Sequence, residues 1–384
     1  MVESADSVLL CAAGDVALGG AIEEALDFAQ SRAALIAGVR DLFANADLRF
    51  VNLDCTFDTT GPPPHPEEYL VHGDPRHLIL LAELGVDLLS LANNHGMDYG
   101  GASLLATRDH VMRLGIRTVG AGVDLNEAGA GTVLVRHGRR VGFLAYASEH
   151  PWVGAIPAGP GAPGVAPIDP ERMNEAIARL RREVDHVVVS VHWGKESLHY
   201  PPPAVLDLGR RLVDQGADLV IGHHPHVVQG IEVSGRGVIL FSLGNLLYPD
   251  YPEQRLSFAG PQRESLVVLV RLSSAGAEVA ELVPVAMAAD GCLARLSEPR
   301  RSEALTEVER YSAVFPRADY PAFWQAQVRR AEVRRLWRVL DEEVLNAGWR
   351  GGACRLARLG RKNFRSIGRS LAEILGRGAG GGRP

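Results

Sequence analysis

The sequence predicts an α/β fold, and three observations support this prediction. Apolar runs of strand length alternate with segments of helical spacing through the first three-quarters of the 384 residues. Several of the helical segments close on glycine, which is a common helix stop. The chain is 46% hydrophobic and 22% charged, a composition typical of a globular protein that can bury a core of useful size.

The predicted elements follow one another in a regular order. Strands are expected at residues 8–14, 48–54, 86–94, 117–122, 185–194, 217–226 and 237–245, where short apolar runs end in Gly, Asp, Asn or His. Helices are expected at 21–43, 75–85, 100–115, 170–184 and 203–216. Two antiparallel pairs complete the pattern: 131–138 with 139–148 around His137-Gly138, and 264–276 with 277–288.

Two segments depart from this alternation. Residues 151–170 are rich in Pro, Gly and Ala, and we expect a long ordered loop or lid, because long loops in compact domains are often functional. Beyond about residue 299 the pattern is helical and basic: residues 300–384 hold 18 Lys+Arg and 9 Asp+Glu, which leaves a net charge of −15 on residues 1–299. We therefore expect a main domain at 1–290, a helical extension at 300–376 and a disordered tail at 377–384.

Composition also excludes several classes of protein. The four cysteines are scattered and form no CxxC pair, which argues against a disulfide framework or a zinc ribbon and fits a reducing compartment. The N-terminus lacks the basic start of a signal peptide, and the chain has no apolar run of about 18 residues, so we expect no transmembrane anchor. We expect a cytoplasmic protein.

Several predicted strands end in a residue that can bind a metal ion. The carboxyl ends of strands share one edge of an α/β sheet, which is the usual place for a ligand site. Asp, Asn and His side chains suit Mn, Fe or Zn, and three histidines fit Mg less well. The sequence therefore predicts a site for one or two divalent ions, formed by Asp15, Asp54, Asn94, His192, His224 and His226.

Single members of this set also have ordinary structural interpretations. Asp15 could cap the following helix, Asp54 could be a turn or cap residue, and His192 could be a hydrogen-bonded core histidine. The run GHHPH (222–226) is harder to explain by packing, because each imidazole needs partners for both nitrogens. On an extended segment the H-x-H pair would place both rings on one side and His223 on the other. Asn93 and Asn245 are expected to shape turns.

The sequence resembles the CapA family of bacterial capsule or poly-γ-glutamate synthesis proteins, relatives of the calcineurin-like metallophosphoesterases. The resemblance rests on six motifs in the family's order: GDVALGG (14–20), VNLD (51–54), LANNHGMDYG (91–100), HWGKE (192–196), GADLVIGHHPHVVQGIE (216–232) and FSLGNLLY (241–248). It implies a four-layer αββα sandwich with two sheets face to face, to which the basic C-terminal helices would be appended.

The resemblance also implies roles for the candidate ligands. Asp15 matches a first-metal ligand and Asp54 a ligand that bridges two metals. Asn94 and His192 match ligands of the second metal, and the H-x-H pair of His224 and His226 would serve one metal each.

Two positions depart from the family pattern. The wider superfamily begins with G-D-x-H, but Ala17 stands at the last position here, so one first-metal ligand is missing. The bridging residue is usually Glu in CapA-like proteins and is Asp54 here, which is one methylene shorter and leaves the occupancy of the first site open.

Hydrolysis is the chemistry that such a site favours. Two ions about 3.5–4 Å apart activate a hydroxide and stabilise the charge that develops on a phosphoester or an amide. The resemblance makes His95 the catalytic histidine, which would protonate the leaving group or stabilise an oxyanion. Asp98 could orient His95 or cap the next helix, and Glu196 could orient an imidazole or be a solvated turn carboxylate. Lys195 and His223 are the candidates for substrate contact.

Two functions remain open from the sequence. The first is a metal-dependent hydrolase acting on a small phosphoester or a γ-glutamyl or other amide-linked metabolite, which the missing anchor favours. The second is a non-catalytic or ligase-accessory protein of poly-γ-glutamate or capsule synthesis. We expect the C-terminal helices to pack on the acidic body, wall the site or form a homodimer contact, and we expect no nucleic-acid binding, because the sequence matches none of the usual modules.

Overall fold

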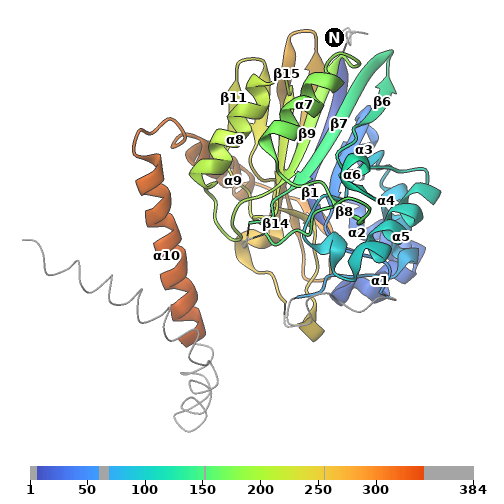
Figure 1. Cartoon of the computed structure of the whole chain (residues 1–384). Coiled ribbons are helices and arrows are strands. Elements are labelled where there is room, and N and C mark those ends of the chain that lie inside the picture. The colour runs from blue at the N-terminus through green and yellow to red at the C-terminus, as the bar shows by residue number, and fades with distance from the viewer. Residues whose placement is uncertain (1–6, 60–68, 151–152, 255, 341–384) are drawn as a thin grey trace, which may run out of the picture. The chain divides into compact units, whose positions relative to one another are not determined.

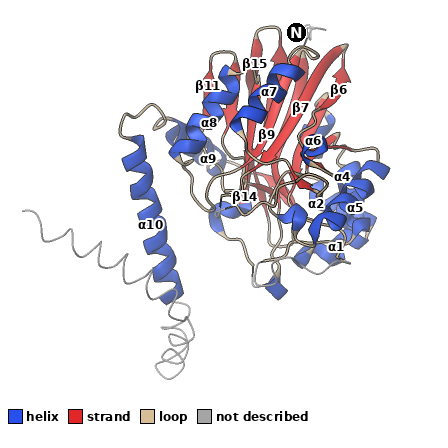
Figure 2. Ribbon diagram, viewed as in Figure 1, coloured by secondary structure: helices blue, strands red, loops and turns tan. Residues whose placement is uncertain are grey.

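The strands of the protein form two large sheets in a mixed α/β arrangement (Figures 1 and 2). The computed structural model describes residues 7–59, 69–150, 153–254 and 256–340. The chain divides into two compact units, Met1–Ala318 and Asp319–Pro384. All of the strands of the described residues lie in the first unit, which carries the candidate site.

The first sheet has the strand order β16-β15-β14-β1-β2-β3-β4, with β13 paired to β1. Its parallel strands are β1 (Val8–Val16), β2 (Leu48–Leu53), β3 (Leu88–Ser90), β4 (Arg117–Val119) and β13 (Asn245–Leu247). Its antiparallel strands are β14 (Glu264–Ser273), β15 (Gly276–Met287) and β16 (Leu293–Arg295). The central strand β1 is almost completely buried, as its apolar run predicts.

The second sheet has the order β11-β12-β10-β9-β7-β6. Its strands are β6 (Thr132–Arg136), β7 (Arg139–Ala147), β9 (His186–His192), β10 (Leu219–His223), β11 (Ile231–Ser234) and β12 (Gly237–Leu240). The central strands β7, β9, β10 and β12 run parallel. The predicted hairpin is confirmed: β6 and β7 meet at His137 (φ 51°) and Gly138 (φ 76°).

The helices lie between and beside these strands. They are α1 (Glu23–Asp27), α2 (Ala29–Ile36), α3 (Arg40–Ala44), α4 (Ile79–Glu83), α5 (Gly100–Arg113), α6 (Leu125–Ala128), α7 (Pro170–Leu180), α8 (Pro203–Asp214) and α9 (Arg300–Ser312). Short 3₁₀ turns are η1 (Gly20–Ile22), η2 (Pro75–Leu78), η3 (His95–Met97), η4 (Pro252–Gln254) and η5 (Gly260–Arg263). In the second unit, α10 spans Tyr320–Leu340.

The two sheets share one hydrophobic core. Phe50 of β2 stacks on Phe143 of β7, with ring centroids 5.9 Å apart. Helix α7 packs closely on the second sheet, because a Cβ added at Gly142 would lie 2.7 Å from the Leu180 side chain. This shared core fixes the carboxyl ends of strands from both sheets relative to one another.

The prediction of one long helix at residues 21–43 is wrong. Residues 21–43 form η1 and three short helices, because Phe28 is extended (φ −111°, ψ 128°) and the chain turns again at Gly38 and Val39. A Cβ at Gly38 would lie 2.3 Å from the carbonyl oxygen of Leu293. The break therefore follows from close packing of this segment on β16, a contact that helical periodicity does not reveal.

The two segments that depart from the alternation are partly described. Residues 153–170 contain β8 (Gly164–Val165), which pairs with β5 (Ala121–Gly122). Helix α9 belongs to the first unit, whereas residues 341–376 of the expected extension and the expected tail 377–384 lie outside the described residues. Over the described ranges, none of the helices combines the length and the apolar character required to span a bilayer.

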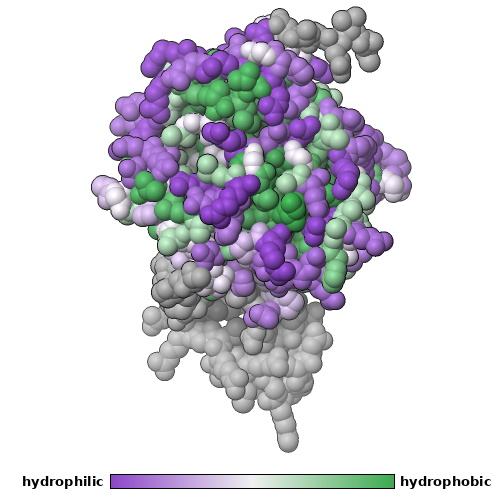
Figure 3. Space-filling view, turned by 90° about the vertical axis from the view of Figure 1, so that its right-hand side faces the viewer, coloured by the Kyte–Doolittle hydropathy of each residue, from purple (hydrophilic) through white to green (hydrophobic). Residues whose placement is uncertain are grey.

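The described surface is mixed in character (Figure 3). Exposed large apolar side chains among the described residues are Phe28, Tyr69, Met112, Val123, Val135 and Val233. In the view of Figure 3, apolar residues lie among hydrophilic ones. Exposed apolar residues of this kind are ordinary for a globular protein.

Candidate metal centre

Six polar residues predicted as ligands meet where strands of the two sheets end. Asp15 lies within β1, Asp54 directly follows β2, and His192 is the last residue of β9. The other three, Asn94, His224 and His226, lie in the turns after β3 and β10. The capping role considered for Asp15 does not apply, because the residue lies in a strand and not before a helix.

Asp54 is the clearest sign of a cation site. Its side chain is 0% exposed, and neither carboxylate oxygen has a hydrogen-bond partner among the described residues. Burial, aided by the nearby Asp15 carboxylate and opposed by His95, raises the pKa of Asp54 to about 7. A buried carboxylate without donors is costly unless a cation compensates it, so the chemistry of this residue fits a metal ligand.

Asp15 is held by donors from several segments. Its Oδ1 accepts hydrogen bonds from Asn52 Nδ2 and His223 Nδ1, each at 2.9 Å, and its Oδ2 accepts from the main-chain N–H of His224 at 3.1 Å. Burial alone would raise the pKa of Asp15, but the hydrogen bond and charge of His223 lower it below its usual range. Asp15 is therefore an ionised carboxylate in a fixed orientation and could serve as a metal ligand.

The expected orientation of His223 is wrong. The prediction that its ring points away from the site assumed an extended chain through GHHPH, but the ring contacts Asp15. The chain leaves the extended conformation at His224 (φ 94°) and again at His226 (φ 55°), so the two-residue periodicity of a strand ends at His223. Both rings of the H-x-H pair nevertheless face the same region, with centroids 5.8 Å apart.

Asn52 was not predicted as a site residue. Its side chain links Asp15 of the first sheet to His192 of the second. Its Nδ2 donates to Asp15 and also to His192 Nδ1, at 3.3 Å. His192 must then carry its proton on Nε2, which donates to Asn94 Oδ1 at 2.8 Å. Asn52 therefore holds the His192 ring in place, but in this tautomer Nε2 carries a proton, which an ion bound at Nε2 would have to displace. The signal that could have found Asn52 is its position two residues before Asp54, on the same face of one strand.

Asn245 fixes His226 in a similar way. Its Nδ2 donates to the carbonyl oxygen of Gln262 at 3.1 Å, so its Oδ1 accepts from His226 Nδ1 at 2.8 Å. His226 therefore has its lone pair on Nε2, which lies 4.0 Å from an Asp54 oxygen. A single lone pair serves one cation at a time.

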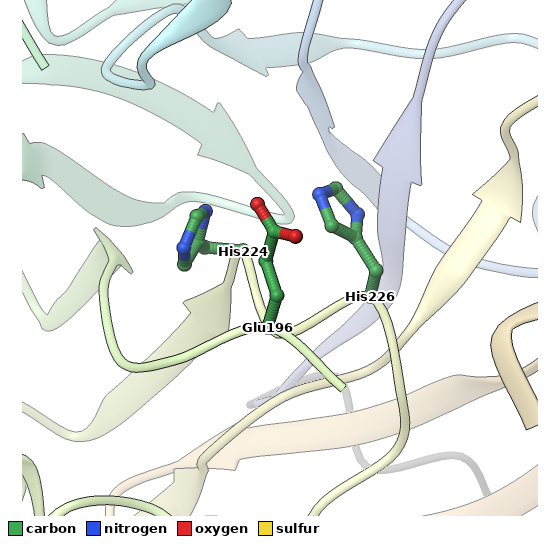
Figure 4. Close-up of side chains that lie close together, drawn as sticks. All are labelled: Glu196, His224 and His226. Carbon is green, nitrogen blue, oxygen red and sulfur yellow. The ribbon is translucent and has the colours of Figure 1, made fainter. Parts of the chain in front are cut away.

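Two groups of three side chains could each hold a cation. The inner group is Asp15, Asp54 and His226, all buried. The outer group is Glu196, His224 and His226, of which Glu196 is exposed, and it is drawn in Figure 4. Within each group the potential ligand atoms lie within 4.8 Å of one another. Carboxylate and imidazole donors of this kind suit Mn, Fe or Zn.

His95 stands beside the ligands with its own carboxylate partner. Its Nδ1 donates to Asp98 Oδ2 at 2.9 Å, and the same oxygen accepts from the Val71 N–H at 2.7 Å. Burial opposes the charged imidazole, but Asp98, with Asp54 and Glu196, raises the pKa of His95 to about 9. Of the two roles considered for Asp98, the hydrogen bond to His95 fits the first, and no side chain caps α5.

The remaining predicted residues have simpler positions. Asn93 shapes the turn as expected: its Nδ2 donates to the Leu53 carbonyl and its Oδ1 accepts from the Gly96 N–H, both at 2.7 Å. Lys195 is half-buried in the turn that leads to Glu196. Contact of Lys195 or His223 with substrate stays a prediction.

Curated proteins of related sequence include two that carry the CapA name. The chain is 34% identical over 170 residues to "PGA biosynthesis protein CapA" of Bacillus subtilis, a stretch that covers 44% of each chain. It is 31% identical over 207 residues to "Capsule biosynthesis protein CapA" of Bacillus anthracis, covering 53% of this chain and 48% of that protein. The chain thus spans about half the length of the curated relatives it matches.

Solved structures show weaker likeness. A phosphatase from Mycoplasma pneumoniae has a TM-score of 0.46 and 14% identity, over 78% of this chain and 97% of that one. The calcineurin-like phosphoesterase YfkN from Bacillus subtilis has a TM-score of 0.41 and 15% identity, over 79% and 97%. TM-scores and identities this low say nothing about the activity of the chain.

The family predicted from the six motifs is confirmed by a match that extends across most of the first unit. Residues 9–250, more than half of the chain, match the family described as "Bacterial capsule synthesis protein PGA_cap", and the chain belongs to this family.

Proposed function

We propose that the protein is a metal-dependent hydrolase whose centre is formed by the inner and outer groups. The observation that carries this proposal is the buried carboxylate of Asp54, which has no hydrogen-bond partner among the described residues and lies among imidazoles at the ends of three strands. One or two divalent ions, with Mn, Fe or Zn favoured, would provide an activated hydroxide and stabilise the charge that develops on the substrate. The four-layer αββα order implied by the resemblance is part of the same proposal.

The residues of the chain supply the rest of the chemistry. In the field of the surrounding carboxylates His95 is protonated at neutral pH, so its Nε2–H can donate a proton to a leaving group. Asp98 keeps the ring oriented through Nδ1. Asp15 and Asn52 hold the metal-facing atoms in place, which removes the need to reorganise them during the reaction.

The substrate class that we propose is a small phosphoester or a γ-glutamyl or other amide-linked metabolite. Both have a polarised centre that a hydroxide can attack and a leaving group that needs a proton. The names of the relatives, which refer to PGA and capsule biosynthesis, favour a γ-glutamyl compound. Lys195, in the turn before Glu196, is the proposed contact for an anionic part of the substrate.

The test combines metal content with turnover. The Mn²⁺-loaded protein is assayed with p-nitrophenyl phosphate and with γ-glutamyl-p-nitroanilide, beside the variants His95→Ala and His110→Ala. We expect His95→Ala to lose about 10²–10⁴-fold in turnover while it retains its Mn²⁺, because general acid catalysis typically contributes this factor. His110→Ala, on α5 and remote from the ligands in the sequence, should retain both properties. Equal turnover in the two variants would contradict the role of His95.

A second function is supported by the names of other relatives. Two proteins from Mycobacterium tuberculosis, 32% identical over 212 residues, are described as "Probable polyglutamine synthesis accessory protein". In that case the centre would bind a ligand without turnover. A protein that is stable without any divalent ion and hydrolyses neither compound would favour this second function over the first.

A further inference from the structure

Glu196 lies beside both histidines of the GHHPH turn although it belongs to a different loop. It follows β9 by four residues, whereas His224 and His226 follow β10. Figure 4 shows the Glu196 carboxylate between the two imidazoles, and its ligand atom lies within 4.8 Å of theirs. The two loops are joined by a hydrogen bond of 2.9 Å from the Ser197 N–H to the Pro225 carbonyl oxygen.

The backbone of both loops is held in an unusual conformation. Four non-glycine residues of the described chain have a positive φ, and three of them are Ser197 (60°), His224 (94°) and His226 (55°). Such conformations are unfavourable for non-glycine residues and persist where the surrounding structure requires them, often at functional sites. Here all three lie in the two loops that bring Glu196, His224 and His226 together.

We propose that Glu196 is a direct ligand of a divalent cation in the outer group, together with His224 and His226. The inference rests on the proposed function, and it adds a ligand at a position to which the family resemblance gives no metal. Glu196 is an oxygen donor on the exposed side of two nitrogen donors, a combination suited to Mn, Zn or Co.

The inner and outer groups compete for His226. His226 has one lone pair, on Nε2, and belongs to both groups. Glu196 raises the affinity of the outer group for an ion relative to that of the inner group. The outer group is open to solvent, whereas the inner group is enclosed. An ion bound with Glu196 should therefore exchange with solvent more easily than one held by Asp15 and Asp54.

The test measures the metal itself in the full-length protein. Glu196→Ala is compared with Glu175→Ala, which makes the same change at an exposed position on α7. Mn²⁺ affinity is measured by calorimetry, and the visible absorption of bound Co²⁺ reports the number and type of its ligands. Both sites are exposed, so both variants should fold, and circular dichroism checks this.

The expected result is a changed Co²⁺ spectrum in Glu196→Ala, with a Mn²⁺ affinity at least tenfold weaker, and a wild-type spectrum and affinity in Glu175→Ala. An unchanged Co²⁺ spectrum in Glu196→Ala would overturn the proposal, whether or not the affinity falls, because a weaker affinity alone would show only that Glu196 positions a histidine. If the wild-type protein bound neither ion, the proposed function itself would fail; if it bound them and Glu196→Ala changed nothing, only this inference would.

Discussion

The aspartates that precede the parallel strands and Asp54, which follows one of them, differ in their hydrogen-bond partners. At the amino ends, Asp47, Asp87, Asp185 and Asp218 directly precede β2, β3, β9 and β10. Each side chain accepts a main-chain hydrogen bond of 2.7–2.9 Å from the neighbouring strand. Each residue also donates its own N–H to the carbonyl of the same neighbouring residue, so both the carboxylate and the main chain of each aspartate are bonded to the neighbouring strand.

At the carboxyl end of β2 the carboxylate of Asp54 has no such donors within the described chain. Asp54 follows the strand that Asp47 begins, and its two oxygens have no partner among the described residues. The amino end therefore stabilises the fold, whereas under the proposed function Asp54 gives up stability for binding. A residue type alone does not show which of the two it does; its hydrogen-bond partners do.

The largest effect is expected from Asp54→Asn. The change removes a carboxylate of the inner group, to which the family resemblance gives a bridging position, so Mn²⁺ affinity should fall by more than the roughly 10–100-fold typical of residues that only support a ligand. Because it also removes a buried charge, the unfolding free energy of the chelator-treated protein should stay equal or rise. Calorimetry and urea unfolding measure the two quantities.

The exposed variant Asp207→Asn on α8 controls for the loss of one negative charge. A wild-type Mn²⁺ affinity in Asp54→Asn would contradict the assignment of Asp54 as a ligand. A large loss of stability in the chelated variant would show instead that Asp54 belongs with the structural aspartates.

Asp218→Asn should give the opposite result. Asp218 is buried and accepts from the Val187 N–H at 2.9 Å and from Arg181 at 2.6 Å, while Arg181 is one-third exposed. Removing one partner of such a pair should lower the unfolding free energy by about 2–3 kcal/mol and leave the Mn²⁺ affinity unchanged. An Mn²⁺ affinity that fell with the stability would show that the two ends of the strands are coupled.

The pH dependence of this loss has a definite sign. Burial alone would raise the pKa of Asp218, but His186, the Val187 N–H and Arg181 lower it. A carboxyl whose pKa is lower in the folded protein stabilises the fold above its unfolded pKa, about 3.9, and this contribution is lost as the pH falls through the folded pKa. The difference between wild type and Asp218→Asn should thus be full at pH 7 and shrink below about pH 4, as urea unfolding at several pH values would measure.

Asn52→Ala should have an intermediate effect. The amide supports Asp15 and His192 without being a proposed ligand, so its loss should weaken Mn²⁺ binding by about 10–100-fold. The matched control is Asn126→Ala, at an exposed position in α6. Equal Mn²⁺ affinity in the two variants would show that Asn52 has no part in the centre.

The comparison of strand ends also explains what the sequence could predict. The candidate ligands can be predicted because apolar runs end in polar residues. Three of them share a further signal: Asp54, Asn94 and His192 each stand seven residues after the aspartate that precedes the strand. That spacing is the length of one strand, from the aspartate at its amino end to the candidate ligand at its carboxyl end. The pattern can be seen in a single sequence, without an alignment.

The errors come from features that periodicity does not record. His223 was placed on the wrong side because the backbone turns to a positive φ at the next residue. The helix expected at 21–43 is broken where Gly38 meets β16, a contact between segments far apart in the chain. Asn52 was missed because an amide inside a strand gives no chemical signal until its partners, Asp15 and His192, are known.

The smallest effect is expected at the amino end, from His137→Asn. His137 Nε2 lies 2.7 Å from Asp47 Oδ1, but the ring is 55% exposed, and an exposed pair contributes at most about 1 kcal/mol. Its positive φ of 51° in a two-residue hairpin turn favours Asn before Gly138, which offsets part of that loss. The unfolding free energy should therefore change by less than about 0.5 kcal/mol in urea unfolding, and the Mn²⁺ affinity should not change. A loss above about 1.5 kcal/mol would show that Asp47 depends on His137, so that its main-chain hydrogen bond alone does not satisfy it.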